Sequence, residues 1–487
     1  MRRSIVKKII LILIFLILSH QPCIGSLLPV GKIEYEFVYD RLERQEALEP
    51  DLFDFQLGPY RDNDGSFRFG PFEYLRRPAP GKLTVFSFVG EDFYSAKAQS
   101  AQGYESLRGG FSAVPMEKLF VYGNFLLDES RAEDETYTGK KWRGLAGGVE
   151  QAFACFRAGP MEITLGRFAS FWGPRNSLVL ASHVALDGLA YKYRWGRLVL
   201  SYRLARLDGL SPEQDSVEQF ENRFLAAHRL DIHFSTRFRL GLFETIVFGG
   251  PGRQVDLVYL NPIVFFHADQ LNDGVDDNTL LGFDFTFVPR GGLKLFGQLL
   301  VDDFQIEKES QSDQEPDQYG LIAGAQWAEV MPQTDLALEY SRVTNWTFNQ
   351  AHPRNRFLFN GDLIGGALGN DYDLWQVTVK RWLSGDMALS LNLSGLRRGE
   401  GRVIDPWTAP WLEIEGEYSE PFPTGVVEKS RSLSLGFAGF LFDHFFLDVE
   451  GGARWVDSYR HVDGDKRTLP FVRLKVSTFL FSSISVE

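Results

Sequence analysis

The sequence predicts an all-β transmembrane barrel of about 18 (about 16 to 18) antiparallel strands, with a small N-terminal periplasmic helical segment. Three observations lead to this fold class: an N-terminal export signal, segments in which apolar and polar residues alternate, and connections that alternate between short and long. The expected division of the chain is a signal peptide over residues 1–25, a periplasmic segment over 26–80 and an outer-membrane β-barrel over 81–487.

The chain begins with the layout of a cleaved secretory signal. Basic residues within positions 2–8 precede an unbroken apolar run over residues 9–18, which is too short to span a bilayer as a helix. Cys23 and Gly25 then stand at the −3 and −1 positions of a cleavage site. A lipoprotein signal would need a small residue before Cys23, where Pro22 stands instead. We therefore expect export with removal of residues 1–25.

Net charge limits the kinds of partner that the protein can bind, and cysteine content limits how the fold can be stabilised. The chain has 51 Lys+Arg and 64 Asp+Glu, a net charge of −13, and the predicted signal removes only basic residues from this balance. Such an acidic chain argues against a nucleic-acid partner. Cys155 alone remains after the signal, so no intramolecular disulfide can form. A closed sheet without free edges would supply the stability instead.

Hydropathy and aromatic content favour a membrane protein built from strands. After the signal, no run of about 18 apolar residues marks a transmembrane helix. Yet the chain has 42 Phe, 17 Tyr, 10 Trp and 47 Gly, which is typical of a barrel whose residues alternate between lipid and lumen. Composition alone leaves a secreted soluble β-sandwich or propeller open.

Residues 26–80 are predicted to hold the periplasmic helical segment. From Glu36 to Leu48, apolar residues recur among charges near helical spacing. Pro50 and the turn-rich stretch 61–65 then interrupt the pattern.

Later segments alternate between an apolar side and a more polar side. In the stretch 198–204, four apolar or aromatic residues share one parity, and Arg203 lies on the other. The stretches 230–242, 389–394 and 446–455 show the same period of two. Segments of about ten residues with one apolar side are the signature of a transmembrane barrel, although a soluble sheet with a buried face shares the period.

Connection lengths favour the barrel over the soluble sheet. Short connections are expected at 195–197, 235–236, 289–291, 384–386 and 443–444. Long polar connections separate them at 129–141, 208–225, 249–278, 307–317, 347–370 and 398–430. Short periplasmic turns and long extracellular loops are typical of outer-membrane barrels. Following this alternation from residue 81 gives about 18 strands, with both ends of the barrel chain on the periplasmic side. The boundaries of the first two strands (81–114) are the least clear.

Tryptophan positions agree with this topology. Three residues fall at the predicted inner ends of strands (Trp195, Trp327 and Trp382), and four at the outer ends (Trp142, Trp346, Trp375 and Trp455). Two aromatic belts at the membrane interfaces would produce this arrangement. Scattered core tryptophans are the alternative.

The sequence offers no catalytic signature. HExxH, G-x-S-x-G, phosphate-loop and dinucleotide motifs are absent, so we expect no enzyme and no cofactor. An outer-membrane hydrolase is the weakest alternative function, because the sequence lacks a Ser/His signature. The oxygen-rich stretch 272–278 could hold Ca²⁺, but it lacks the EF-hand frame, and a solvated loop without metal is expected.

Charged residues of both signs are predicted to face the lumen. They are Arg203, Arg237, Arg239, Glu339, Lys380, Asp448, Glu450 and Arg454, together with Arg473 and Lys475. Mixed signs indicate a salt-bridged, partly closed lumen, whereas a ring of one sign would indicate a selective ion path.

The longest outer loop carries candidate glycan-binding residues. Trp407 and Trp411 precede a run of acidic residues, and Trp172 and Arg175 on a neighbouring outer loop are further candidates. Aromatic rings stack on the apolar faces of sugars, and carboxylates accept hydrogen bonds from hydroxyl groups. The alternative is a loop that folds inward and packs its tryptophans on the lumen wall.

Several short stretches resemble the Wzi-type capsule-assembly family of outer-membrane lectins. They are 28–31 with the following EYEFVYDRLERQEAL, 166–167 with 171–174, 228–230 with 241–244, 259–262, 277–282 and 298–303. The resemblance implies an 18-stranded barrel in the cell outer membrane that helps to retain capsular polysaccharide. It implies outer-membrane lipid and surface polysaccharide as partners, but it transfers no individual glycan-binding residue.

Two functions therefore stay open. The first is the binding or retention of surface polysaccharide through extracellular loops. The second is a channel or porin-like transporter with a loop-gated lumen. Glycan binding by the purified barrel, compared with its conductance in a bilayer, separates the two.

Overall fold

The computed structural model describes most of the chain after residue 80. The described residues are 40, 43, 44, 46–48, 81–96, 99–133, 139–181, 184–210, 221–304, 314–366, 368–414, 417–441 and 445–485. The predicted signal peptide and most of the predicted periplasmic segment lie outside them. Among the described residues, no helix is long and apolar enough to cross a membrane.

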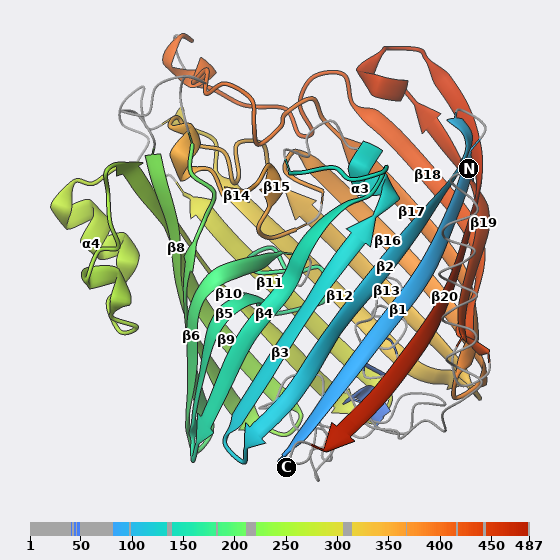
Figure 1. Ribbon diagram of the computed structural model, residues 1–487. Helices are drawn as coiled ribbons and strands as arrows, with labels where there is room; N and C mark the ends of the chain where they lie inside the picture. The colour runs from blue at the N-terminus through green and yellow to red at the C-terminus, as the bar shows by residue number, and fades with distance from the viewer. Residues whose placement is uncertain are drawn as a thin grey trace.

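Eighteen antiparallel strands form one closed barrel (Figure 1). Consecutive strands pair with each other, and β1 pairs with β20 to close the ring, for instance Leu83 opposite Ile484. This confirms the predicted fold class. The strands are β1 Lys82–Ala96, β2 Gln99–Met116, β3 Leu119–Asp128, β4 Ala146–Ala158, β5 Met161–Ala169, β6 Ala185–Trp195, β7 Leu198–Arg206, β8 Glu221–Ser235, β9 Phe238–Pro251, β10 Asn278–Arg290, β11 Leu293–Asp303, β12 Gln318–Met331, β13 Thr334–Val343, β16 Tyr372–Ser384, β17 Met387–Arg398, β18 Glu428–Leu441, β19 Phe445–Asp457 and β20 Lys466–Ser485.

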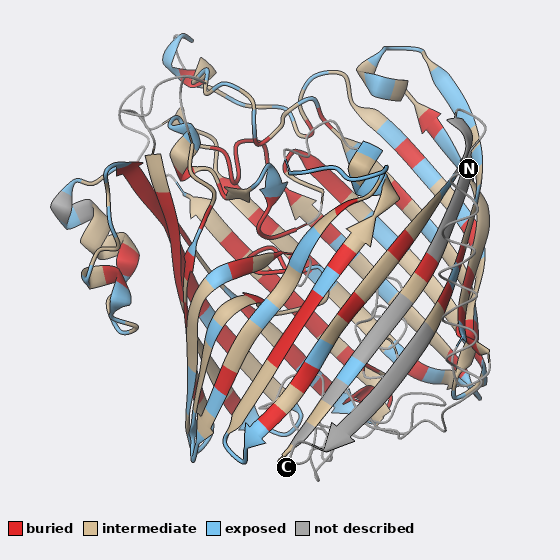
Figure 2. Cartoon of the chain, viewed as in Figure 1, coloured by how far each residue is buried: buried red, intermediate tan, exposed pale blue. Residues whose placement is uncertain are grey.

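The two sides of the wall follow the parity that the sequence predicts. On β9, Leu242 is exposed on the outside, whereas its neighbour Phe243 is buried in the interior. On β17, Leu389 and Leu393 are exposed outward. Buried and exposed residues consequently alternate along the strands in Figure 2. Lipid on one side and a filled interior on the other impose this period of two.

Short and long connections lie at opposite ends of the barrel. Two-residue turns join β6 to β7 and β16 to β17, and Gly196 supplies a positive φ of 57° in the first of them. The long connections at the other end run over 129–145, 207–220, 252–277, 304–317, 344–371 and 399–427, close to the expected boundaries. A further long connection, 170–184, joins β5 to β6 and was not among those expected.

Among the described residues, an extensive apolar cluster lies inside the barrel. Loops 170–184 and 344–371 fold inward, and their buried residues, including Leu178 and Phe357, pack against wall residues such as Leu225 and Leu300. The second loop forms a hairpin, β14 (Leu358–Phe359) with β15 (Asp362–Leu363). The Gly366 amide donates to the Ser177 carbonyl at 2.9 Å. At Gly365, a Cβ would lie 1.8 Å from the Leu178 carbonyl oxygen, so only glycine permits this approach.

Residues near position 44 lie at the opposite, periplasmic end. The described residues among 40–48 are helical, as the sequence predicts for this stretch. The Gly292 amide, in the turn between β10 and β11, donates to the Ala47 carbonyl at 2.7 Å. Arg44 pairs at 2.6 Å with Glu329, which lies near the inner end of β12. We call residues 40, 43, 44 and 46–48 the inner helix residues.

The other short helices described by the structure lie in the outer connections. They are α3 Glu129–Glu133, η3 Val258–Leu260, α4 Phe266–Asp273, η5 Pro353–Asn355, η6 Pro410–Leu412 and η7 Tyr459–His461.

The predicted tryptophan belts are correct for five of the seven residues. Trp195 and Trp327 are exposed near inner strand ends, and Trp142, Trp375 and Trp455 near outer ends. Trp382 is buried and points inward, where its Nε1–H donates to Asp335 at 2.6 Å, and Trp346 is buried in an outer loop. Those two placements correct the prediction, because a position near a strand end does not fix which side a ring faces.

Candidate functional site

Two loops meet over the outer end of the barrel, and they carry the candidate site. Loop 344–371 follows β13, and loop 399–427 follows β17. The Asp371 carboxylate joins them, because it accepts hydrogen bonds from the Gly401 amide at 2.9 Å and from the Thr424 amide at 3.0 Å. Arg356 donates to the Asp405 carbonyl at 2.7 Å. These contacts fix the second loop against the first.

Four aromatic residues pack together where the loops meet. Trp346 lies edge-to-face with Trp407 (ring centroids 5.0 Å apart) and with Trp411 (5.6 Å). Trp407 and Trp411 are 5.7 Å apart, and Tyr418 lies 6.3 Å from Trp411. We call these four residues the outer-mouth cluster. Edge-to-face pairs at such distances contribute about 0.5–1.5 kcal/mol each beyond their burial, so the rings hold one another in place.

The four rings differ in exposure. Trp411 is 2% exposed and Trp346 is also buried, whereas Trp407 is only half-buried. Pro406 and Thr408 beside Trp407 are exposed. The structure therefore places one predicted glycan-binding residue, Trp407, at the surface and the other, Trp411, beneath it. The prediction that both bind glycan stays untested.

A carboxylate lies against the cluster. Glu420 Oε1 accepts hydrogen bonds from Trp346 Nε1 at 2.9 Å, from Asn345 Nδ2 at 3.0 Å and from the Tyr418 hydroxyl at 3.3 Å. Burial raises the pKa of Glu420 above its usual range, although these donors act in the opposite direction. Sequence analysis missed Glu420, since it lies nine positions beyond Trp411 and only the fold brings the two together.

Trp172 and Arg175 lie elsewhere. Their loop begins and ends at the outer strand ends but folds into the lumen, where Trp172 is buried in the interior cluster. Arg175 pairs with Asp40 and, at 2.9 Å, with Glu43 of the inner helix residues. This corrects the expectation that both residues lie on an exposed outer loop. The apolar run 178–180 in this loop is the sequence feature that could have indicated the inward folding, because its residues pack in the interior cluster.

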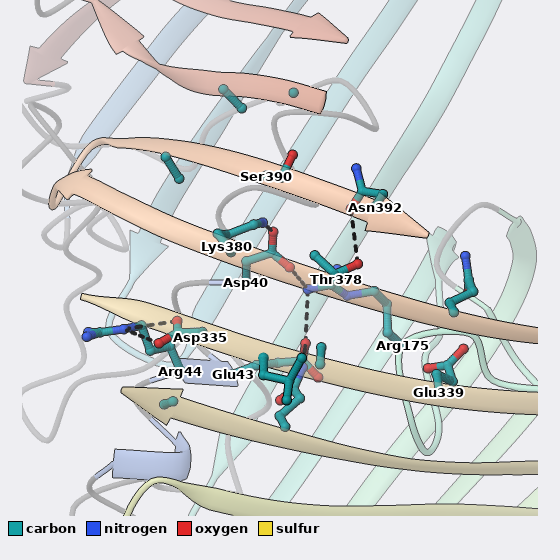
Figure 3. A pocket seen from close by; sticks show the side chains of 18 of the residues that line it. Asp40, Glu43, Arg44, Arg175, Asp335, Glu339, Thr378, Lys380, Ser390 and Asn392 are labelled. Carbon is teal, nitrogen blue, oxygen red and sulfur yellow. Dashed lines mark hydrogen bonds and ion pairs between the residues drawn. The ribbon is translucent and has the colours of Figure 1, made fainter. Parts of the chain in front are cut away.

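A cavity of about 460 Å³ lies in the lumen beside the inner helix residues. Figure 3 shows Asp40 between Lys380 and Arg175, with Arg175 also bonded to Glu43. Deeper in, Lys294 pairs with both Glu43 and Glu46 at 3.0 Å. Burial alone would raise the pKa of Glu43, but Lys294 and Arg175 outweigh it and hold that pKa below its usual range.

Part of the predicted lumen charge network lines this cavity. Glu339, Lys380, Asp448 and Glu450 all do so. Asp448 and Glu450 each pair with Arg473 at 3.1 Å, and Glu339 accepts from Asn176 at 2.6 Å.

Arg473 lines the cavity too, whereas the lining does not include the other five predicted members, which are Arg203, Arg237, Arg239, Arg454 and Lys475. Arg203 is buried and donates to the carbonyls of Phe168 and Leu186. Arg237 is exposed in a turn, Arg239 donates to Thr286 at 3.3 Å, and Arg454 is exposed near the outer end of β19. Strand parity predicted the wall residues, but not the acidic partners Asp40, Glu43 and Glu46, which come from outside the barrel strands.

The oxygen-rich stretch 272–278 uses its carboxylates within the protein. Asp277 pairs with Arg253 and accepts from the Tyr259 hydroxyl at 2.8 Å, and Asp276 pairs with Arg354 at 3.2 Å. In the described part of the chain, no three His, Cys, Asp or Glu residues form a group that could hold a metal ion.

Comparison with known proteins agrees with the observed barrel fold. A family model described as capsule assembly protein Wzi matches residues 195–469. No curated protein matches the chain.

Among solved structures, the chain is similar to Wzi of Escherichia coli, with a TM-score of 0.53, 14% identity, and coverage of 80% of this chain and 84% of that one. That protein is described as an outer-membrane protein involved in group 1 capsule assembly and as a carbohydrate-binding β-barrel. OccK1 (OpdK) of Pseudomonas aeruginosa matches with a TM-score of 0.47, 13% identity, and coverage of 82% and 99%. The second similarity is too distant to bear on this chain. Because the family model covers more than half of the residues, the chain belongs to the capsule assembly protein Wzi family and is an outer-membrane β-barrel.

Proposed function

We propose that this protein binds capsular-type polysaccharide at the outer mouth of its barrel, with Trp407 as the ring that contacts sugar. The observation that carries the proposal is the outer-mouth cluster, in which two buried tryptophans support a third that is half-exposed. A ring already held in place loses little conformational freedom on binding, so more of the stacking energy appears as affinity. In this proposal Trp411 supports Trp407 from beneath.

Neighbouring polar groups suit the same ligand. Glu413 is exposed two positions beyond Trp411, and Thr408 is exposed beside Trp407. Carboxylate and hydroxyl oxygens accept hydrogen bonds from sugar hydroxyls. A repeating polymer can also engage many copies of a weak site at once, which raises the overall affinity without new contacts.

Family membership and the description of the E. coli protein as a carbohydrate-binding barrel support this reading. The filled interior supports binding over a porin-like channel, because loops 170–184 and 344–371 pack an apolar cluster across the lumen. We also propose that the protein is not an enzyme. Cleavage of residues 1–25, a periplasmic segment over 26–80 and a barrel domain over 81–487 complete the proposal.

Replacing Trp407 tests the site. Trp407→Ala is expected to weaken polysaccharide binding about fivefold, since one stacked ring contributes about 1 kcal/mol. Trp407→Phe should recover part of the loss. Trp142→Ala is the matched control, because Trp142 is an exposed tryptophan on a different outer connection. Binding is measured with immobilised surface polysaccharides, and folding by the shift of unheated protein on detergent gels.

Two results would contradict the proposal. If Trp407→Ala binds as tightly as wild type at equal folded amounts, the cluster is not the site. If wild type binds no polysaccharide but conducts small solutes in a bilayer, the channel function replaces the one proposed here.

A further inference from the structure

One outer connection, residues 252–277, folds back over the outside of the barrel. Tyr259 and Phe266 are fully buried against Phe248 and Ile246 of β9. The Tyr259 ring lies 4.7 Å from Phe248, and the Tyr202 hydroxyl of β7 donates to the Tyr259 carbonyl at 2.6 Å. We call residues 252–277 the outer flap.

Strand parity shows that this contact lies on the outward face. Leu225, Ala227 and Val247 belong to the interior cluster. Phe224, Ala226, Ile246 and Phe248 alternate with them and pack against the outer flap instead. Figure 1 shows α4 of the flap outside the ring of strands, away from the loops over the mouth.

The outer flap covers a polar pair on this outward face. His228 Nε2 lies 3.1 Å from Glu244 Oε2, and Glu244 is buried. Glu244 accepts hydrogen bonds from the Phe266 amide at 2.9 Å and from the His267 amide at 2.8 Å, at the start of α4. The Phe266 ring lies 4.4 Å from the His228 ring. Ionisable groups facing lipid are costly, so the first turn of α4 screens this pair from the surroundings of the barrel.

Large apolar side chains are exposed on the outer flap, with the polar Asn261 exposed among them. Leu257 is 81% exposed, Ile263 is 84% exposed and Phe265 is 55% exposed. Leu260 is exposed on the same segment. This surface continues the lipid-facing wall, where Leu242 and Phe283 are exposed on neighbouring strands.

The height of the flap fits the outer leaflet. It packs on Glu244 to Phe248, in the outer half of β9, which begins at the inner turn with Phe238. The apolar band of such barrels is about 25 Å tall. The charged Arg253, Asp256 and Asp277 lie together at the outer end of the flap, with Arg253 2.6 Å from Asp256. Charges at the outer end and exposed apolar residues below it are typical of an element that lies in a membrane interface.

We propose that the outer flap is embedded in the outer leaflet, with Leu257, Ile263 and Phe265 in contact with lipid acyl chains. Continuity with the lipid-facing wall favours lipid over a second copy of the chain. The flap then acts as part of the barrel wall. It places apolar side chains against lipid at the position where His228 and Glu244 would otherwise face the lipid.

Spin labelling tests this arrangement. Single cysteines at Leu257 and Ile263, in a Cys155→Ala background and reconstituted in phosphatidylcholine vesicles, carry a nitroxide label. Leu242→Cys on the wall is the lipid-exposed control. Leu412→Cys, an exposed apolar position on the mouth loop, is the water-exposed control.

Labels at 257 and 263 are expected to collide with oxygen several-fold more than with a water-soluble nickel chelate, as at 242 and in contrast to 412. Nickel accessibility equal to that at 412 would overturn the proposal. Dipolar broadening between labels on different molecules, with low oxygen accessibility, would overturn it in favour of a second copy. Neither result depends on whether polysaccharide binds at Trp407.

Discussion

Glu315 lies in the loop between β11 and β12, next to the outer-mouth cluster. Its carboxylate accepts from Gln318 Nε2 at 2.6 Å, and the adjacent Gln314 accepts from the Tyr418 amide at 3.3 Å. Burial raises the pKa of Glu315 to about 7, and the nearby Asp303 carboxylate adds to the shift. The protonated carboxyl is therefore the form of Glu315 that stabilises this packed loop.

The raised pKa of Glu315 predicts that this loop loosens as pH rises. An unfolded Glu titrates near about 4.3. The stabilisation from protonated Glu315 is thus fully present below that pH and is lost as pH rises through about 7. We expect backbone amides over 314–320 to be better protected from hydrogen exchange at pH 5 than at pH 8, after correction for intrinsic rates. Glu315→Gln should flatten the difference, whereas Glu413→Gln, at an exposed position, should not. An unchanged pH dependence in Glu315→Gln would assign it to another group.

Strands β8 to β10 show how one alternating pattern serves two environments. Leu240 of β9 lies opposite Ile232 of β8 and Phe285 of β10, and all three have the outward parity. The inward residues include Arg229, which donates to Asp284 at 2.9 Å and to Asp231 at 2.7 Å. Charges are tolerated inside because they are paired, and apolar residues are required outside because lipid offers no partner.

Depth along β9 predicts graded effects of arginine substitution. Leu242 is nearer the middle of the apolar band than Leu240, which lies two positions from the start of the strand. Leu242→Arg is expected to destabilise the barrel by about 2–4 kcal/mol, and Leu240→Arg by less. Arg239→Ser, on the inward side, should cost least, because it places no charge against lipid and removes a side chain that bonds to Thr286 at 3.3 Å. Urea unfolding in lipid vesicles measures the series. Equal effects of Leu242→Arg and Arg239→Ser would contradict the assigned parity.

The whole molecule is a barrel filled at two heights. Apolar loops occupy the outer half of the lumen, and the inner helix residues lie across the inner half through ion pairs. Arg175 joins the two, since it comes from an inward-folding outer connection and pairs with Asp40 and Glu43. The pairs of Lys294 with Glu43 and Glu46 are buried. Removing one partner of a buried pair destabilises a structure by about 3–5 kcal/mol.

Reversing one charge is expected to release the inner filling. Lys294→Glu would place a carboxylate beside Glu43 and Glu46, where the ammonium group now pairs with both. A reporter, Ser390→Cys in a Cys155→Ser background, lies in the lining of the cavity. We expect a membrane-impermeant thiol reagent to modify it several-fold faster in the Lys294→Glu protein. Lys192→Glu, at an exposed lysine of β6, is the control. Equal rates in the two proteins would show that these pairs do not shield the cavity.

Local patterns in the sequence were sufficient for the wall. The period of two in stretches such as 230–242 predicted which residues face outward. The alternation of short and long connections predicted a barrel of about 18 strands, although the long connection 170–184 was not among those expected. Lipid and interior act on each residue of a strand separately, so the pattern can be read without knowing the neighbours. The resemblance to the Wzi family also followed from short stretches, and the family model confirms it.

Only the tertiary structure decided where the connections go. Trp172 and Arg175 face the lumen, Trp411 lies beneath Trp407, and residues 252–277 cover the outer wall. A loop has no periodic pattern to show its direction, and its path depends on surfaces that exist only after the barrel has closed. Trp411 is buried because Trp346 arrives from a loop that precedes it by two strands. The sequence by itself determined the barrel and its two sides. The packing of distant loops determined the filled lumen, the support beneath Trp407 and the outer flap.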